Sequence, residues 1–143
     1  MRTASKKWLM SLAFVLPALA LAQGGADFGK YEYYAKCASC HGESGKGDGK
    51  VAEYLTKPPA DLTTYAKRNG GVFPTQLAWD VIDGRPVAIG PHGTREMPVW
   101  GQEFRRETVR PADRLDPKGP SPEWFVSRRI AALIDYLASI QKL

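Results

Sequence analysis

The sequence predicts an all-α fold built from short helices and long loops. No segment alternates apolar and polar residues over a length that would make a strand. Near the C-terminus, by contrast, Ser121 can cap a helix that has Pro122 at its first position. Apolar residues three and four positions apart give this helix a stripe of Ile130, Leu133, Ile134, Leu137 and Ile140. Glycine and proline interrupt much of the remaining chain, so the other helices should be short.

The first half of the chain should hold three short helical segments. Asp27 can cap a helix that runs up to the first cysteine, and residues 42–50 follow it with four glycines, which predict a loop. A helical stretch is expected over residues 51–55 and a helical turn over residues 61–66. The sequence Asn-Gly-Gly at 69–71 should end that turn.

The second half should hold one short helix before the C-terminal one. Residues 74–82 have a helical pattern that ends at Gly84. Residues 85–101 contain three prolines and three glycines and are expected to form an extended loop. Residues 103–120 are expected to be a charged connection, which is either a solvated loop, a docking segment or a segment that packs over the edge of a cofactor. Its basic residues are Arg105, Arg106, Arg110, Arg114 and Lys118.

The N-terminus has the pattern of a secretory signal peptide. Three basic residues precede an apolar run over residues 9–22, which is too short for a membrane span and closes with Ala20-Leu21-Ala22. We therefore expect residues 1–22 to be cleaved and residues 23–143 to form one exported domain, with an uncleaved membrane anchor as the alternative. Removal takes three of the 20 basic residues and no acidic one, which leaves 17 against 15. So small a net charge gives no reason to expect a nucleic acid or an anionic membrane as partner.

The two cysteines of the chain occur in the motif Cys37-Ala38-Ser39-Cys40-His41. On one helical turn both sulfurs can reach the two vinyl groups of one haem, and the adjacent histidine can bind the iron from the same side. A zinc site would need about four ligands, and the mature chain has only these cysteines, His41 and His92. A thioredoxin-like pair would need a βαβ context, and a disulfide would leave His41 unexplained. The motif therefore predicts one covalently attached c-type haem.

The other face of the iron needs a second ligand or stays open. Met97 is the sole methionine left after signal removal, and it precedes Pro98 in a loop, so we expect it to be the second ligand. Ordinary core packing is the alternative for a methionine. His92, in Gly90-Pro91-His92-Gly93, is the rival ligand.

Residues 29–143 resemble the class I c-type cytochromes, in particular the small bacterial proteins with one haem. Gly29 and Tyr33 are similar to the contact positions of the family's N-terminal helix, and Tyr136 to their aromatic partner on the C-terminal helix. The segment 58–62 is similar to the loop in which a proline carbonyl, here of Pro58 or Pro59, accepts the free ring N–H of the ligating histidine. Residues 97–101 are similar to the axial methionine loop.

The resemblance implies the cytochrome c fold, with helices and loops wrapped around the haem. With Cys37 and Cys40 holding the haem and His41 and Met97 holding its iron, the expected function is one-electron transport in the periplasm and not enzymatic catalysis. The expected partners are a respiratory or dehydrogenase complex as donor and an oxidase or reductase as acceptor. The protein would be a free monomer or a subunit of a redox complex. An enzyme or gas sensor with an open iron is the alternative.

Overall fold

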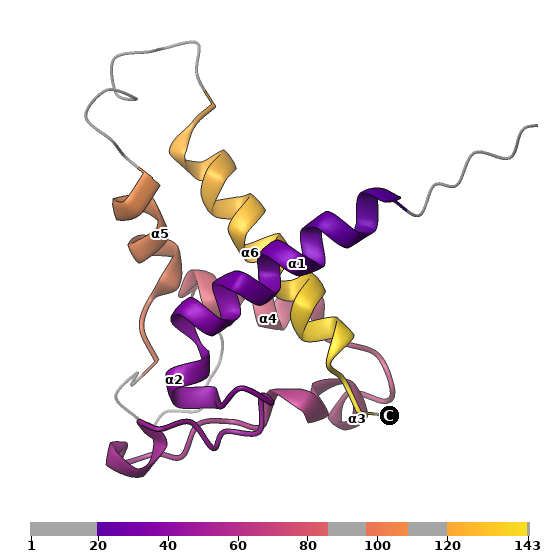
Figure 1. Ribbon diagram of the computed structural model, residues 1–143, viewed down its shortest axis with the longest axis vertical. Coiled ribbons are helices and arrows are strands. Elements are labelled where there is room, and N and C mark those ends of the chain that lie inside the picture. The colour runs from indigo at the N-terminus through magenta and orange to yellow at the C-terminus, as the bar shows by residue number, and fades with distance from the viewer. Residues whose placement is uncertain (1–19, 86–96, 109–119, 143) are drawn as a thin grey trace, which may run out of the picture.

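The structure is a computed structural model and describes residues 20–85, 97–108 and 120–142. Its described residues form α-helices and short 3-10 helices and contain no strand, so the all-α prediction is confirmed. Two long helices dominate, α1 (Ala20–Lys36) and α6 (Pro122–Ser139). Figure 1 shows them crossing near their middles.

The crossing of α1 and α6 depends on a glycine. A Cβ atom at Gly29 would lie 1.8 Å from the backbone oxygen of Ala132, so only glycine lets the helices approach this closely. Beside it, the ring of the fully buried Tyr33 lies 5.1 Å from the ring of Tyr136, centroid to centroid. The contact between Gly29, Tyr33 and Tyr136 that the resemblance implied is therefore present.

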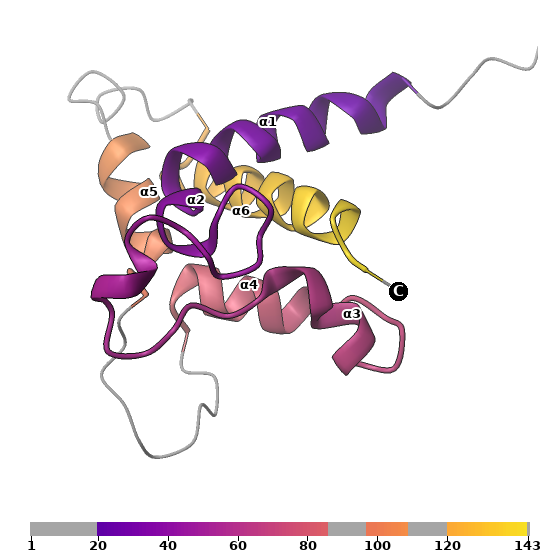
Figure 2. The same ribbon diagram turned by 60° about the horizontal axis from the view of Figure 1, so that its bottom comes forward.

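Helix α6 supplies most of the core. Four residues of the predicted stripe, Ile130, Leu133, Ile134 and Leu137, are buried, and the fifth, Ile140, is partly buried against them. Val126, one turn before the stripe, is buried as well. Figure 2 shows α6 between α1 and α4 (Thr75–Asp83), and α6 packs against both of them. The predicted cap is also confirmed, because the Ser121 hydroxyl accepts a hydrogen bond from the Trp124 amide at 3.3 Å.

The short elements lie close to the predicted positions. They are α2 (Ala38–His41), η1 (Ala52–Tyr54), η2 (Leu62–Thr64) and α3 (Tyr65–Arg68). The Asp61 carboxylate accepts a 2.8 Å hydrogen bond from the Thr63 amide at the start of η2, and Gly84 ends α4 in the left-handed conformation. At the C-terminus, the Lys142 amide donates to the Thr63 carbonyl at 2.8 Å, which ties the chain end to η2.

Two predicted boundaries are wrong. Helix α1 begins at Ala20, so Asp27 lies inside it and does not cap it. Packing on α6, which reaches back to Gly25 beside Asp135, stabilises α1 upstream of Asp27.

The second correction concerns residues 100–108. They form the helix α5 (Trp100–Thr108), where a loop and then a charged connection were predicted. Neither proline nor glycine interrupts residues 102–108, and Trp100 and Phe104 share one face with ring centroids 6.0 Å apart. Phe104 is fully buried, so packing of two aromatic residues stabilises a helix whose other residues are mostly charged.

Candidate functional site

The Cys37-x-x-Cys40-His41 motif forms a separate turn at the end of α1. The Cys37 amide donates to the Tyr33 carbonyl at 2.8 Å, so the motif continues directly from the helix that crosses α6. The amides of Cys40 and His41 both donate to the Cys37 carbonyl, at 3.1 and 2.9 Å. These bonds place the two sulfurs and the imidazole on a single helical turn, which is fixed to the core through α1.

Both thiols are free and partly buried. Burial, and to a lesser extent the nearby Glu32 and Cys40, together raise the pKa of Cys37 to about 12. A thioredoxin-like pair works through a thiolate of lowered pKa. The environment of Cys37 is the opposite of that, and among the described residues no sheet provides a thioredoxin-like context.

The His41 ring is fixed by a backbone carbonyl. Its Nδ1 lies 3.0 Å from the carbonyl oxygen of Ala60. A carbonyl only accepts, so Nδ1 carries the proton and Nε2 keeps its lone pair. Burial lowers the pKa of His41 and so favours the neutral ring. The hydrogen bond to Ala60 has a smaller effect in the opposite direction. A neutral imidazole of fixed tautomer is the form that binds a metal ion.

The acceptor of this bond corrects the sequence prediction, which named Pro58 or Pro59. The reason lies in the glycine-rich loop, which packs on the proline segment. A Cβ at Gly47 would lie 2.3 Å from the Pro59 oxygen, so that carbonyl faces the loop, and the next one, from Ala60, meets His41. The Pro-Pro sequence therefore predicts which segment supplies the acceptor for His41. The packing of the glycine-rich loop decides which carbonyl of that segment faces the His41 ring.

The glycine-rich loop is itself anchored on the motif. The Gly47 amide donates to the His41 carbonyl at 2.8 Å, with Gly47 in the left-handed region at φ 84°. The Gly42 carbonyl accepts from the buried Tyr33 hydroxyl at 2.6 Å. No sequence pattern pointed to this bond, which joins the contact between α1 and α6 to the residue that follows His41.

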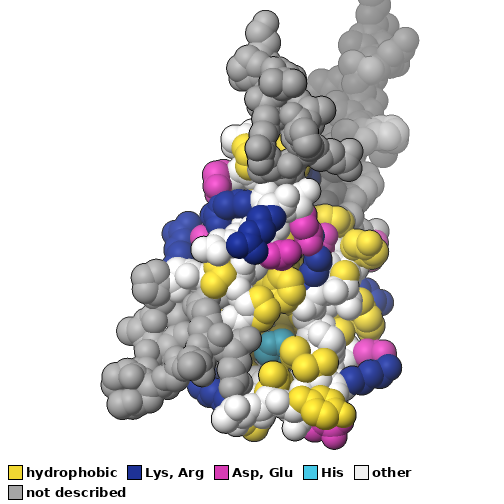
Figure 3. Space-filling view, turned by 90° about the vertical axis from the view of Figure 1, so that its left-hand side faces the viewer, with side chains coloured by type: hydrophobic (Ala, Val, Ile, Leu, Met, Phe, Trp, Pro, Cys, Tyr) yellow, Lys and Arg dark blue, Asp and Glu magenta, His cyan; other side chains and the backbone are white. Residues whose placement is uncertain are grey.

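His41 lies in a recess of the surface. In Figure 3 the histidine is seen at the bottom of a hollow with hydrophobic side chains beside it. This histidine is His41, because His92 lies outside the described residues. Met97 is partly buried and packs against the same core cluster as Cys37. In both ribbon views the start of α5, three residues after Met97, lies on the same side of the molecule as α2 (Figures 1 and 2).

The donor set fits a covalently attached haem better than a metal bound by side chains alone. In the part of the chain that the structure describes, no three His, Cys, Asp or Glu side chains gather into a metal site. Two free thiols beside a histidine with an unprotonated Nε2, next to a hydrophobic recess, are instead the groups that haem attachment needs.

The basic residues predicted for docking have different surroundings. Arg105 binds Asp83 and Glu123, so it belongs to a network between helices. Arg106 is exposed, and within the part of the chain that the structure describes its ion pair is with Glu103, inside α5. Arg110, Arg114 and Lys118 lie outside the described residues.

Comparison with known proteins leaves the family open. No protein-family model matches the chain, and no curated protein and no solved structure matches it either. Among the described residues, no helix has the length and apolar character needed to cross a membrane.

Proposed function

We propose that this protein is a c-type cytochrome of the class I fold that carries single electrons outside the cytoplasm. Cys37 and Cys40 would hold one haem through thioether bonds, with His41 and Met97 as the axial ligands of its iron. When bound, haem supplies reversible one-electron chemistry at the iron. The observation that carries the proposal is the His41 ring, held in its metal-binding tautomer 3.0 Å from the Ala60 oxygen and one turn from two free thiols.

The helix crossing supports the same conclusion. Gly29 lets α1 and α6 pack closely, and the motif follows α1 directly. The core therefore holds one end of the attachment turn, and the Ala60 carbonyl holds the other. A histidine fixed at two points changes position little when the charge on a bound iron changes, which favours fast electron exchange.

Met97 decides between a carrier and a catalyst. If its sulfur occupied the second axial position, an exogenous ligand could bind only by displacing it, and electron exchange would be the favoured chemistry. Its place just before α5 and against the core supports this role. Donor and acceptor would be redox proteins that dock transiently. Export to the periplasm follows from the predicted signal peptide.

A spectroscopic experiment tests the proposal. The full chain would be expressed with the haem-attachment machinery, and visible spectra recorded for the oxidised protein, the reduced protein and the reduced protein under carbon monoxide. We expect c-type bands that carbon monoxide does not alter. Ready binding of carbon monoxide would instead indicate an open iron, and therefore a haem enzyme or gas sensor.

Covalent attachment needs its own control. The double variant Cys37→Ser/Cys40→Ser should lose haem on a denaturing gel, whereas Ser39→Ala, which changes the exposed residue between them, should retain it. Retention of haem by the double variant would refute thioether attachment.

A further inference from the structure

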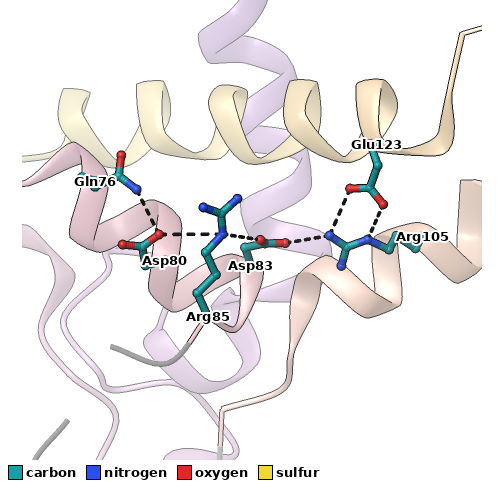
Figure 4. A network of polar contacts seen from close by, with 6 residues as sticks. All are labelled: Gln76, Asp80, Asp83, Arg85, Arg105 and Glu123. Carbon is teal, nitrogen blue, oxygen red and sulfur yellow. Dashed lines mark hydrogen bonds and ion pairs between the residues drawn. The ribbon is translucent and has the colours of Figure 1, made fainter. Parts of the chain in front are cut away.

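The strongest structural feature that the proposed function leaves unused is an ion-pair network centred on Arg105, in the second turn of α5. Figure 4 shows it joining α4, α5 and α6. Arg105, on α5, binds Glu123 on α6 with two bonds, from Nε at 2.7 Å and from Nη2 at 3.1 Å. The same Nη2 donates to Asp83, at the end of α4, at 3.2 Å.

The network is built into the packing of α5. The Asp83 side chain is only 9% exposed and also accepts a 3.0 Å bond from Arg85. A Cβ at Gly101 would lie 2.1 Å from Oδ1 of Asp83, so a glycine is needed where α5 approaches this carboxylate. One turn later Phe104 is fully buried, with the guanidinium of Arg129 4.0 Å from its ring centroid.

This packing controls the position of Met97 through a very short connection. Only Pro98 and Val99 separate Met97 from the first residue of α5. The ring of Pro98 fixes its φ angle, and the Val99 carbonyl accepts from the amides of Gln102 and Glu103 at 3.1 and 3.2 Å. The position of the first turn of α5 therefore limits where the Met97 sulfur can lie.

We propose that the network of Asp83, Arg105 and Glu123 is a positioning device for the axial methionine. By holding the first turn of α5, it keeps the Met97 sulfur against the iron and so sets how readily another ligand displaces it. This inference rests on the proposed function. None of the three charged residues is itself a proposed ligand, and they would act through the backbone between Met97 and Gly101.

Imidazole titration of the oxidised haem protein tests the inference, because imidazole must displace the methionine to bind. For Arg105→Gln we expect about tenfold tighter apparent binding of imidazole, the ratio that 1.4 kcal/mol of lost restraint produces. Glu123→Gln, which leaves the Asp83 bond in place, should show a smaller increase of about threefold. Arg105→Lys keeps the charge without the two-pronged geometry and should fall between parent and Arg105→Gln.

The matched control is Arg106→Gln. It removes the same charge from the next residue of α5, but Arg106 pairs with Glu103 inside the helix. Its imidazole affinity should stay within about twofold of the parent, as expected for an exposed pair of small energy. Met97→Leu gives the upper limit, since it removes the competing ligand altogether. Circular dichroism of each variant confirms folding, and Glu123→Gln, whose carboxylate is 63% exposed, serves if Arg105→Gln does not fold.

The outcomes separate the two proposals. If Met97→Leu binds imidazole more tightly than the parent while Arg105→Gln and Glu123→Gln behave like Arg106→Gln, the positioning role is refuted and methionine ligation stands. A lower unfolding midpoint alone would then mark the network as merely structural. If Met97→Leu leaves the affinity at the parental value, Met97 is not the ligand and both proposals fall.

Discussion

The substitution Gly29→Ala tests whether the crossing of α1 and α6 is as tight as the structure indicates. The added Cβ would lie 1.8 Å from the Ala132 oxygen, and real Cβ atoms stay at least 3.0 Å away from such a neighbour. The two helices must therefore separate by about 1.2 Å, or one must rotate. Either change disturbs the packing of Tyr33 against Tyr136.

The magnitude follows from two opposing effects. Forcing an extra carbon into a packed interface costs about 1–3 kcal/mol and sometimes more, and the separation also loses contacts along both helices. Alanine regains about 1 kcal/mol over glycine from helix propensity. The difference, taken at the upper end of the cost because the overlap is with backbone, is a fall of about 2 kcal/mol in the free energy of unfolding. For a chain of this size Tm should fall by about 7 °C.

Gly25→Ala is the matched control, one turn earlier on the same helix. Its Cβ would meet the Asp135 carboxylate at 3.4 Å, an ordinary contact. This variant should gain about 0.5–1 kcal/mol from helix propensity alone. Urea unfolding of the purified exported protein, followed by far-ultraviolet circular dichroism, measures both. If Gly29→Ala is as stable as Gly25→Ala, the close approach of the helices is refuted.

Two further predictions concern stability. Tyr33→Phe should cost about 1–3 kcal/mol, because the buried Gly42 carbonyl loses its 2.6 Å donor; urea unfolding that matches the parent would contradict this. Glu107→Gln should flatten the decline of stability in acid. A hydrogen bond from Lys36, and then Arg129, lowers the pKa of Glu107. The ionised Glu107 therefore stabilises the folded protein above the ordinary glutamate pKa, and this stabilisation is lost as the pH falls through the lowered pKa. The effect should be under about 1 kcal/mol, because the residue is exposed to solvent. An unfolding midpoint in Glu107→Gln that still falls as steeply as the parent's between pH 5 and 3 would exclude this role.

The accuracy of the sequence predictions depends on how local their physical causes are. The cap at Ser121, the apolar stripe of α6 and the end of α4 at Gly84 each follow from residues within one or two turns, and all three are present. The grouping of Cys37, Cys40 and His41 is local in the same sense. The partner of His41 is not local, because Ala60 supplies it from 19 positions away.

Helix α5 shows why nonlocal packing escapes a reading of the sequence. Its composition is mostly polar, and its arginines look like those of a solvated surface segment. In the structure the guanidinium of Arg105 satisfies carboxylates from two other helices, one of them Asp83, whose side chain is 9% exposed. A charge that holds helices together and a charge that attracts a partner have the same sequence signature. The two kinds of charge differ in what their removal does. Removing a charge that holds helices together loosens the residues attached to its helix, whereas removing a charge that attracts a partner alters only encounters with other proteins. In the proposed cytochrome the residue attached to the helix is the proposed ligand Met97. A change at Arg105 should therefore alter the ligand affinity of the proposed haem iron before it alters the salt dependence of docking.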